Sequence, residues 1–184
     1  MPFNSKEYKN KMQKTYEVFL KDLSTLRTGR ANASMLDIVK VDVYGQKMPI
    51  NQLGTISVPE PRQLSIQVWD QNNVSLVDSA LRKSELALNP KIDGQLLRIP
   101  IPEPTEERRK ELKKIVKGLS EKSKVAVRNI RREANDQLKK MLKSKETGED
   151  EFNKYEKEIQ SITDDQIKKV EETTEKKEKE IMNV

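Results

Sequence analysis

The sequence predicts an α+β protein: an elongated three-helix bundle with a β-rich domain inserted between its first and second helices. Apolar residues recur at helical spacing near both ends of the 184-residue chain, whereas strand-like alternation is confined to the middle. Seven of the eight prolines lie between Pro49 and Pro104. Charged residues make up 36% of the chain and aromatic residues 4%, a balance typical of long exposed helices with narrow apolar stripes.

The first helix is predicted over residues 5–28, because apolar side chains recur there at spacings of three and four. Asn4 or Ser5 could cap its start, and Gly29 could end it. The predicted stripe consists of Tyr8, Met12, Tyr16, Phe19, Leu23 and Leu26.

The segment 31–104 is predicted to be an inserted domain with its own small core, since roughly 70 residues suffice for one. Trp69 is expected in that core, beside the apolar residues that precede it. The expected strands cover 38–43, 48–50, 55–58, 64–69 and 96–101, with a short helix over 73–84.

Two long helices are predicted after the insert, over 105–143 and from 149 or 150 to about 182. Thr105 can cap the first of them. Helices with such narrow stripes are unstable alone, so residues 1–30 and 105–184 are expected to form one bundle. The stripe expected on the first of these two helices is Leu112, Ile115, Leu119, Ala126, Ile130, Leu138 and Met141.

Only two narrow crossings connect the insert to the bundle, and prolines stiffen the second crossing. Two rigid bodies joined in this way are expected to move about a hinge. The candidate hinge residues are Arg30, Ala31, Pro102, Glu103 and Pro104.

The residue inventory excludes most kinds of catalysis. The chain has no cysteine and no histidine, which removes thiolate nucleophiles, thiolate metal sites and imidazole acid–base chemistry. Acidic pairs such as Asp164-Asp165 and Glu171-Glu172 are interpreted as solvated helix surface. We therefore expect no catalytic residue, metal or cofactor. Without a long apolar run or a signal segment, a cytoplasmic protein that spans no membrane is expected.

Positive charge is concentrated in the first 30 residues, with a net charge of +4, and in residues 105–145, with +9. Residues 31–104 carry −1 and residues 146–184 carry −6. At about 100° per residue, six cations of the helix 105–143 fall within roughly 80° of one another, and its apolar stripe is centred about 140° away. These cations are Lys113, Lys117, Lys124, Arg128, Arg131 and Lys139.

A row of cations over several helical turns fits the phosphates of a nucleic acid. The alternative is an ordinary solvated helix face, which an acidic third helix could also neutralise. Arg27 and Arg30 add two guanidiniums at the end of the first helix. The helix dipole also favours basic residues there, which is an alternative explanation for their position. Arg109 lies in the first turn of the long helix, where a cation opposes the dipole, so it is a further binding candidate.

Four long stretches of the chain have a distinctive sequence: LRTGRANASMLD (26–37), LNPKIDG (88–94), RIPIPEPTEERRKEL (98–112) and VAVRNIRREAND (125–136). In these stretches the chain closely resembles the bacterial ribosome recycling factors. The resemblance extends over the whole chain. It implies an L-shaped molecule with a three-helix bundle, and a β/α/β domain inserted through a flexible hinge.

The resemblance also implies a function. Members of the family bind the large subunit of the post-termination ribosome through ribosomal RNA and, with elongation factor G and GTP, promote dissociation into subunits and release from mRNA. By likeness, Arg128 and Arg131 are the principal RNA contacts, and Arg27, Arg30 and Arg109 support them. A monomer is expected. The alternative hypothesis is an intracellular helical scaffold or chaperone that binds protein partners.

Overall fold

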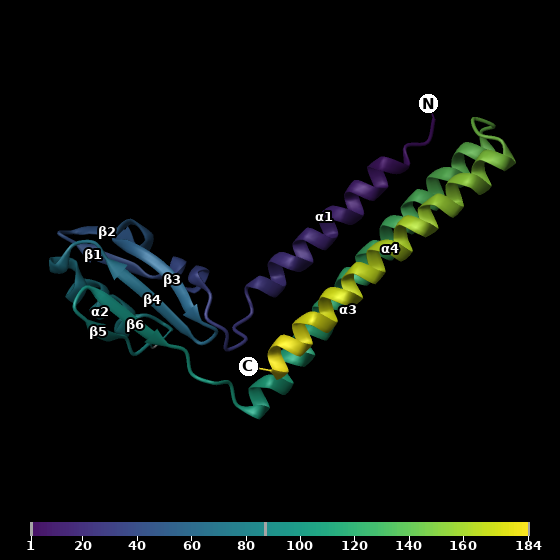
Figure 1. The fold of residues 1–184 in the computed structure, drawn as a ribbon. Coiled ribbons are helices and arrows are strands. Elements are labelled where there is room, and N and C mark those ends of the chain that lie inside the picture. The colour runs from purple at the N-terminus through teal and green to yellow at the C-terminus, as the bar shows by residue number, and fades with distance from the viewer. Residues whose placement is uncertain (1, 87, 184) are drawn as a thin grey trace. The chain divides into compact units, whose positions relative to one another are not determined.

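The computed structural model describes residues 2–86 and 88–183 (Figure 1). The chain divides into two compact units. One contains Met1–Leu26 and Glu106–Asn183, and the other contains the intervening residues 27–105. None of the helices in the described ranges is long and apolar enough to cross a lipid bilayer.

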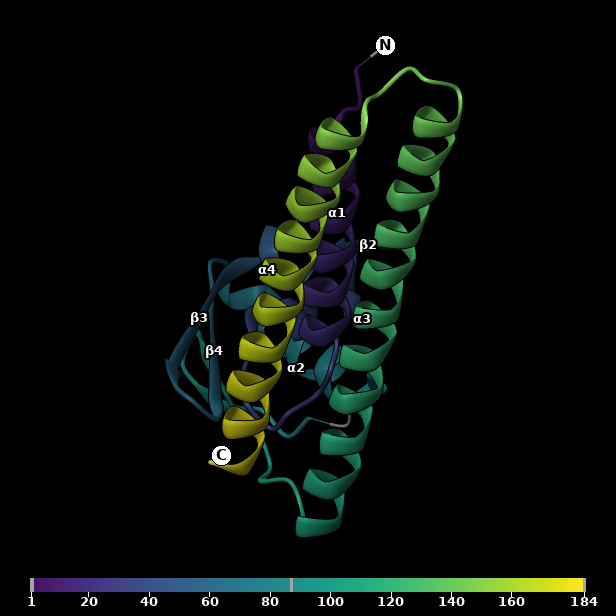
Figure 2. The same cartoon turned by 90° about the vertical axis from the view of Figure 1, so that its right-hand side faces the viewer.

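The first unit is a three-helix bundle of α1 (Ser5–Ser24), α3 (Glu106–Lys143) and α4 (Glu149–Met182). Each helix contacts the other two, with α3 antiparallel to both α1 and α4 (Figure 2). The three helices and their approximate bounds confirm the prediction. The expected α+β class is confirmed as well.

Helix α1 buries the predicted stripe through Tyr8, Met12, Phe19 and Leu23. It ends at Ser24, four residues before the predicted end, so the expectation that Gly29 terminates it is wrong. The hydroxyl of Ser24 donates to the carbonyl of Lys21, and Thr25 donates to Asp22 in the same way. These side chains satisfy carbonyls of the last turn, which allows the helix to stop there.

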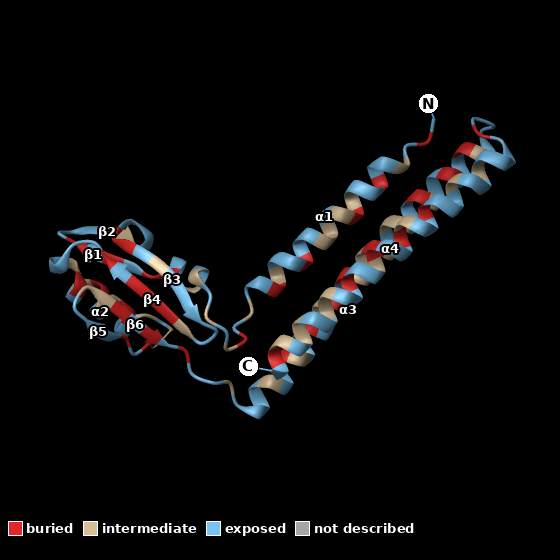
Figure 3. Cartoon of the chain, viewed as in Figure 1, coloured by how far each residue is buried: buried red, intermediate tan, exposed pale blue. Residues whose placement is uncertain are grey.

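The buried face of α3 differs from the predicted one. Val116 and Val127 are fully buried, whereas their predicted neighbours in the stripe are not: Ile115 is 40% exposed and Ala126 is half-buried. Both positions of each pair are apolar, so periodicity alone does not choose between them. Packing against α1 and α4 selects the buried position of each pair, and it rotates the buried face toward the row of cations. Figure 3 shows the buried residues of the helices in red.

The bundle core contains two apolar clusters, one near each end, with polar side chains in the stretch between them. The buried Gln166 donates from Nε2 to Oε1 of Gln13, at 3.4 Å. Near the second cluster, Thr174 donates to the hydroxyl of Ser120 at 3.0 Å. Hydrogen bonds as well as apolar contacts therefore stabilise the bundle core.

The inserted unit combines a hairpin, a four-stranded sheet and one helix. Its elements are β1 (Lys40–Val43), β2 (Gln46–Pro49), β3 (Gly54–Glu60), β4 (Gln63–Val68), α2 (Val74–Lys83), β5 (Lys91–Asp93) and β6 (Leu96–Pro100). Strands β1 and β2 pair with each other, and the larger sheet has the antiparallel order β3-β4-β6-β5. Short 3₁₀ helices occupy Ala33–Ile38, Ile50–Gln52 and Gln71–Asn73.

Two local expectations for the insert are wrong, and one strand was not predicted. Ile38 ends a 3₁₀ helix instead of starting a strand, and the edge strand β5 was not expected. Trp69 is 60% exposed, and its Nε1 donates to Oγ1 of Thr55 at 3.1 Å. Since Val68 points into the core, strand alternation directs the next side chain to the opposite face of the sheet.

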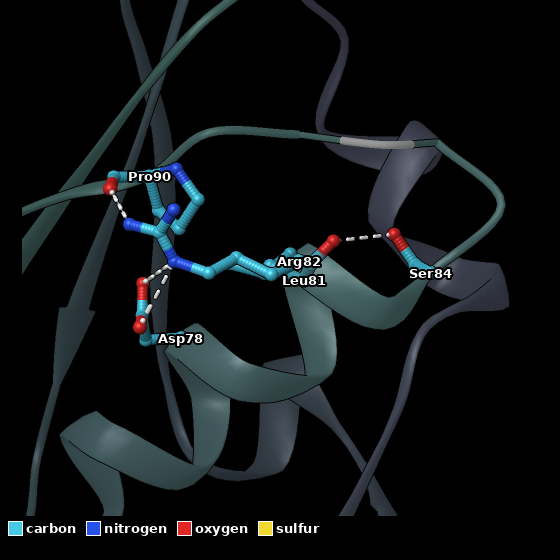
Figure 4. Close-up of polar contacts among 5 residues, drawn as sticks. All are labelled: Asp78, Leu81, Arg82, Ser84 and Pro90. Carbon is cyan, nitrogen blue, oxygen red and sulfur yellow. Dashed lines mark hydrogen bonds and ion pairs between the residues drawn. The ribbon is translucent and has the colours of Figure 1, made fainter.

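Hydrogen bonds connect the end of α2 to the segment that follows it (Figure 4). The Nε of Arg82 donates to the carboxylate of Asp78 at 3.1 Å, and its Nη2 donates to the carbonyl of Pro90 at 2.9 Å. The hydroxyl of Ser84 donates to the carbonyl of Leu81 at 2.7 Å. These bonds place Pro90 beside α2, shortly before β5 begins.

Candidate nucleic-acid interface

The predicted row of cations lies on one flank of α3, beside the buried seam. Lys113, Lys124, Arg128 and Arg131 are half-buried, while the other two members of the row are exposed. On a helical wheel the buried residues of α3 lie roughly 20–100° to one side of Lys113, and the row extends to its other side. The predicted separation of about 140° from the apolar face is therefore wrong, because the buried face is rotated.

Two members of the row contact α4. The guanidinium of Arg131 donates to Oε1 of Gln160 at 3.4 Å, and Nε2 of Gln160 donates to Asp164 at 2.8 Å. Two turns from Arg131 toward the N-terminus of α3, the ammonium of Lys124 lies 3.3 Å from a carboxylate oxygen of Glu171. Side chains of α4 thus contact two members of the row.

The acidic α4 neutralises little of the row. Lys124 is paired with Glu121 on its own helix and with Glu171 on α4. In the part of the chain that the structure describes, no carboxylate lies within ion-pair distance of the five other cations. These five are Lys113, Lys117, Arg128, Arg131 and Lys139.

The remaining candidate arginines are not part of this row. Arg109 is half-buried in the first turn of α3, roughly 40° from Lys113 on the side of the buried face. Arg27 and Arg30 are exposed and belong to the inserted unit, with the buried Thr28 between them. Gly29 adopts a φ of 83°, a conformation that favours glycine.

The pattern of α3 alone could not identify the residues of α4 that contact the row. Gln160 and Glu171 reach it across the helix pair, and they are recognised only when the register of α3 against α4 is known. Charge counting along each helix indicates an acidic α4 but does not say which carboxylates face the cations.

The inserted unit has a hollow of about 680 Å³ beside α2. Its lining includes the cations Lys40 and Lys83 and the acids Asp42 and Glu85, together with apolar residues. Because the opposite charges balance, the hollow offers no net charge to attract an anion or a cation. Within residues 2–86 and 88–183, acidic side chains form no group of three that could hold a metal ion.

A model of the ribosome recycling factor family matches residues 19–182. The chain belongs to this family. A ribosome recycling factor from Zymomonas mobilis is 51% identical over 180 residues, which cover 98% of this chain and 97% of the relative. One from Geobacillus thermodenitrificans is also 51% identical, over 176 residues that cover 96% of this chain and 95% of the relative.

Solved ribosome recycling factors share the fold. A solution structure has a TM-score of 0.72 and 42% identity, covering 97% of this chain and 95% of that one. A second structure contains the T. thermophilus ribosome recycling factor and the E. coli elongation factor G bound to the E. coli post-termination complex. Its matching chain has a TM-score of 0.61 and 48% identity, with 95% of each chain covered. The family resemblance read from the sequence is confirmed.

Membership in the ribosome recycling factor family makes the chain a translation factor and not an enzyme. The site to be explained is therefore a binding surface. The cationic row on α3 is the candidate surface, because among the described residues carboxylates pair with only one of its six members.

Proposed function

We propose that this chain binds the post-termination ribosome and, with elongation factor G and GTP, promotes its dissociation into subunits with release from mRNA. The related T. thermophilus factor is bound, together with elongation factor G, to such a complex. The cationic row of α3 is the observation in this chain that carries the proposal. On this basis the protein acts in the cytoplasm, as a monomer, on the large subunit.

Binding through the row is electrostatic. Five of its six cations have no carboxylate within ion-pair distance among the described residues, so they are available to RNA phosphates. Arg128 and Arg131 lie three residues apart on one helix face, and two planar guanidiniums at that spacing can contact neighbouring phosphates. Each phosphate contact releases counterions, so the affinity falls steeply as the salt concentration rises.

Arg27, Arg30 and Arg109 are proposed as supporting RNA contacts. Arg27 and Arg30 are exposed and therefore accessible to RNA, and Arg109 shares α3 with the row. The family resemblance, in addition to their charge, supports this role.

The proposed hinge lies where the chain enters and leaves the insert. The amide of Ala31 donates to the carbonyl of Pro61 at 2.7 Å, and the amide of Ile101 donates to the carbonyl of Arg62 at 2.8 Å. Both chain crossings are therefore attached to the turn between β3 and β4. We expect bending to concentrate just outside these attachments, at Arg30 and at Pro102, Glu103 and Pro104, with Ala31 at the margin.

The decisive experiment is a light-scattering assay of ribosome dissociation. Post-termination ribosomes are mixed with elongation factor G and GTP, with and without this protein. Loss of scattering only when the protein is present is the expected result. Unchanged scattering, with a known recycling factor active in the same ribosomes, would contradict the proposal.

Co-sedimentation with large ribosomal subunits tests the binding mode. Association at low salt that is lost at high salt supports RNA contact through the cationic row. Association that resists moderate salt would favour the alternative of a helical scaffold acting through apolar protein contacts.

A further inference from the structure

One cation in the row of α3 differs from its neighbours in its surroundings. The ammonium of Lys124 lies 3.4 Å from a carboxylate oxygen of Glu121 and 3.3 Å from one of Glu171. The side chain of Lys124 is only 15% exposed, whereas that of Glu171 is 58% exposed. The side chain of Lys124 is therefore largely shielded from solvent, whereas the carboxylate of Glu171 on α4 beside it is exposed.

Arg128 lies one turn further along the same flank and provides the comparison. No carboxylate of the described residues is within ion-pair distance of Arg128, and Arg131 donates to the neutral amide oxygen of Gln160 on α4. Among the described residues, Lys124 is thus the member of the row that forms an ion pair with α4.

A carboxylate beside a cation affects an incoming phosphate in two ways. It already occupies the ammonium, and it repels the phosphate because both groups are negative. A cation that is paired internally releases fewer counterions when RNA approaches, and it contributes less to affinity and to its salt dependence.

We propose that Glu171 is a built-in competitor of RNA phosphate at Lys124. It limits how tightly the bundle binds the large subunit and so favours release of the factor after each round. This inference rests on the function proposed above. Glu171 acts through Lys124 as a positioning residue and does not itself contact RNA.

The pair with Glu171 is expected to contribute little to folding. Glu171 is 58% exposed, so solvent screens its charge, and Lys124 keeps the carboxylate of Glu121 beside it when Glu171 is replaced. A Gln at position 171 keeps the size and a polar oxygen of the side chain while it removes the charge. The folded bundle is therefore expected to tolerate the substitution.

The test compares Glu171→Gln with Glu172→Gln. Glu172 is the next residue of the same helix, is exposed, and has no cation within ion-pair distance among the described residues. The two variants have the same net charge and the same chemical change. Any difference between them therefore reports the position of the carboxylate and not the overall charge of the protein.

Binding to large ribosomal subunits is measured over a series of salt concentrations. Glu171→Gln is expected to bind about 3–10-fold more tightly than the wild type at low salt. The slope of log affinity against log salt should be steeper by at most about 0.7–0.9, because Glu121 still lies 3.4 Å from the ammonium of Lys124. Glu172→Gln is expected to change affinity less than about twofold, with an unaltered slope. Adding Lys124→Gln to Glu171→Gln should remove the gain and return the slope to the wild-type value.

The outcomes separate this inference from the proposed function. If the wild type binds in a salt-dependent way and the two glutamine variants bind alike, the role of Glu171 is disproved and the proposed function stands. If the wild type fails to bind large subunits, the proposed function is disproved and the inference with it. Equal urea midpoints for all variants show that binding, and not folding, has been compared.

Discussion

The ammonium of Lys11 lies 2.8 Å from Oε1 of Glu133, which joins the first half of α1 to α3. The same ammonium is 3.5 Å from Glu7 and 5.1 Å from the ring centre of Tyr8. The hydroxyl of Tyr8 donates to Oε1 of Gln137 on α3. These contacts form one polar cluster along the edge of the α1–α3 interface.

The cluster predicts a loss of stability at high pH. The hydrogen bond to Glu133 raises the pKa of Lys11 above its ordinary value of 10.5. Burial first, and the charge of Glu133 second, raise the pKa of Tyr8 above 10.0. Both groups hold their protons more tightly in the folded state, so their stabilising contribution is complete below the unfolded pKa values and is lost as pH rises through the folded ones.

We therefore expect the free energy of unfolding to fall as pH rises from about 10. Tyr8→Phe and Lys11→Met should each make this fall shallower. Urea unfolding monitored by circular dichroism between pH 9 and 11.5 measures it. A wild-type stability that stays constant over this range would contradict the assignment.

Arg131→Ala is expected to cost about 1–3 kcal/mol of affinity for large ribosomal subunits, because a guanidinium is lost from the phosphate-binding row. The control is Arg132→Ala, which removes the same charge from the next residue of α3. Arg132 points roughly 100° away from Arg131 and should affect binding much less. Sedimentation binding measures both, and equal losses would show that only total charge matters.

Gly118→Ala is expected to stabilise the bundle by about 0.5–1 kcal/mol. Gly118 lies inside α3, and an added Cβ would meet nothing within 4 Å. Alanine therefore gains helix propensity without a clash. The urea midpoint should rise with an unchanged denaturant slope, and an unchanged or lower midpoint would contradict the prediction.

Gly54→Ala should have the opposite effect, in the inserted unit. A Cβ on Gly54 would lie 2.5 Å from the carbonyl oxygen of Gln67 on the paired strand β4, so the two strands would have to separate. A cost of about 1–3 kcal/mol is expected. The single tryptophan, Trp69, is hydrogen-bonded to β3 and reports this unit by fluorescence, whereas far-ultraviolet circular dichroism reports chiefly the helices.

The proposed hinge can be tested with a reversible cross-link. The chain has no cysteine, so Arg30→Cys with Glu103→Cys creates the only two thiols. Joining them with a reducible bifunctional reagent should preserve ribosome binding but prevent dissociation into subunits. Reduction of the same sample is the control and should restore activity. Full dissociation by the cross-linked protein would remove hinge motion from the mechanism.

Helical periodicity predicted the bundle well, because α1, α3 and α4 each carry an apolar stripe many turns long. Periodicity failed where local hydrogen bonds set the end of a helix, or where packing against neighbouring helices sets its buried face. The hydroxyls of Ser24 and Thr25 end α1 early, and the adjacent apolar pair Ile115-Val116 leaves the phase of α3 open. Short elements such as β5 leave too few residues for a pattern.

The cationic row was predictable as a set, since helical geometry places its members on one flank. The burial of these cations and their partners on α4 could not be predicted in this way. Half-burial of Lys113 and Arg128 follows from the rotation of α3, and the pairing of Lys124 with Glu171 follows from the register of two helices. Such contacts between residues far apart in sequence are invisible to any single-helix pattern.

The place of α1 in the chain has a consequence for protein synthesis. Its contacts reach far ahead: Ser5 donates to Glu158 at 2.7 Å, and Lys11 binds Glu133. At about 5–20 residues per second, a nascent chain needs on the order of ten seconds to make these partners after α1 is complete. During that time the insert can fold from neighbouring residues, while Met12 and Phe19 have no helix to cover them. The helix translated first therefore waits longest for the partners that bury it, and a chain halted before α4 would leave the bundle incomplete.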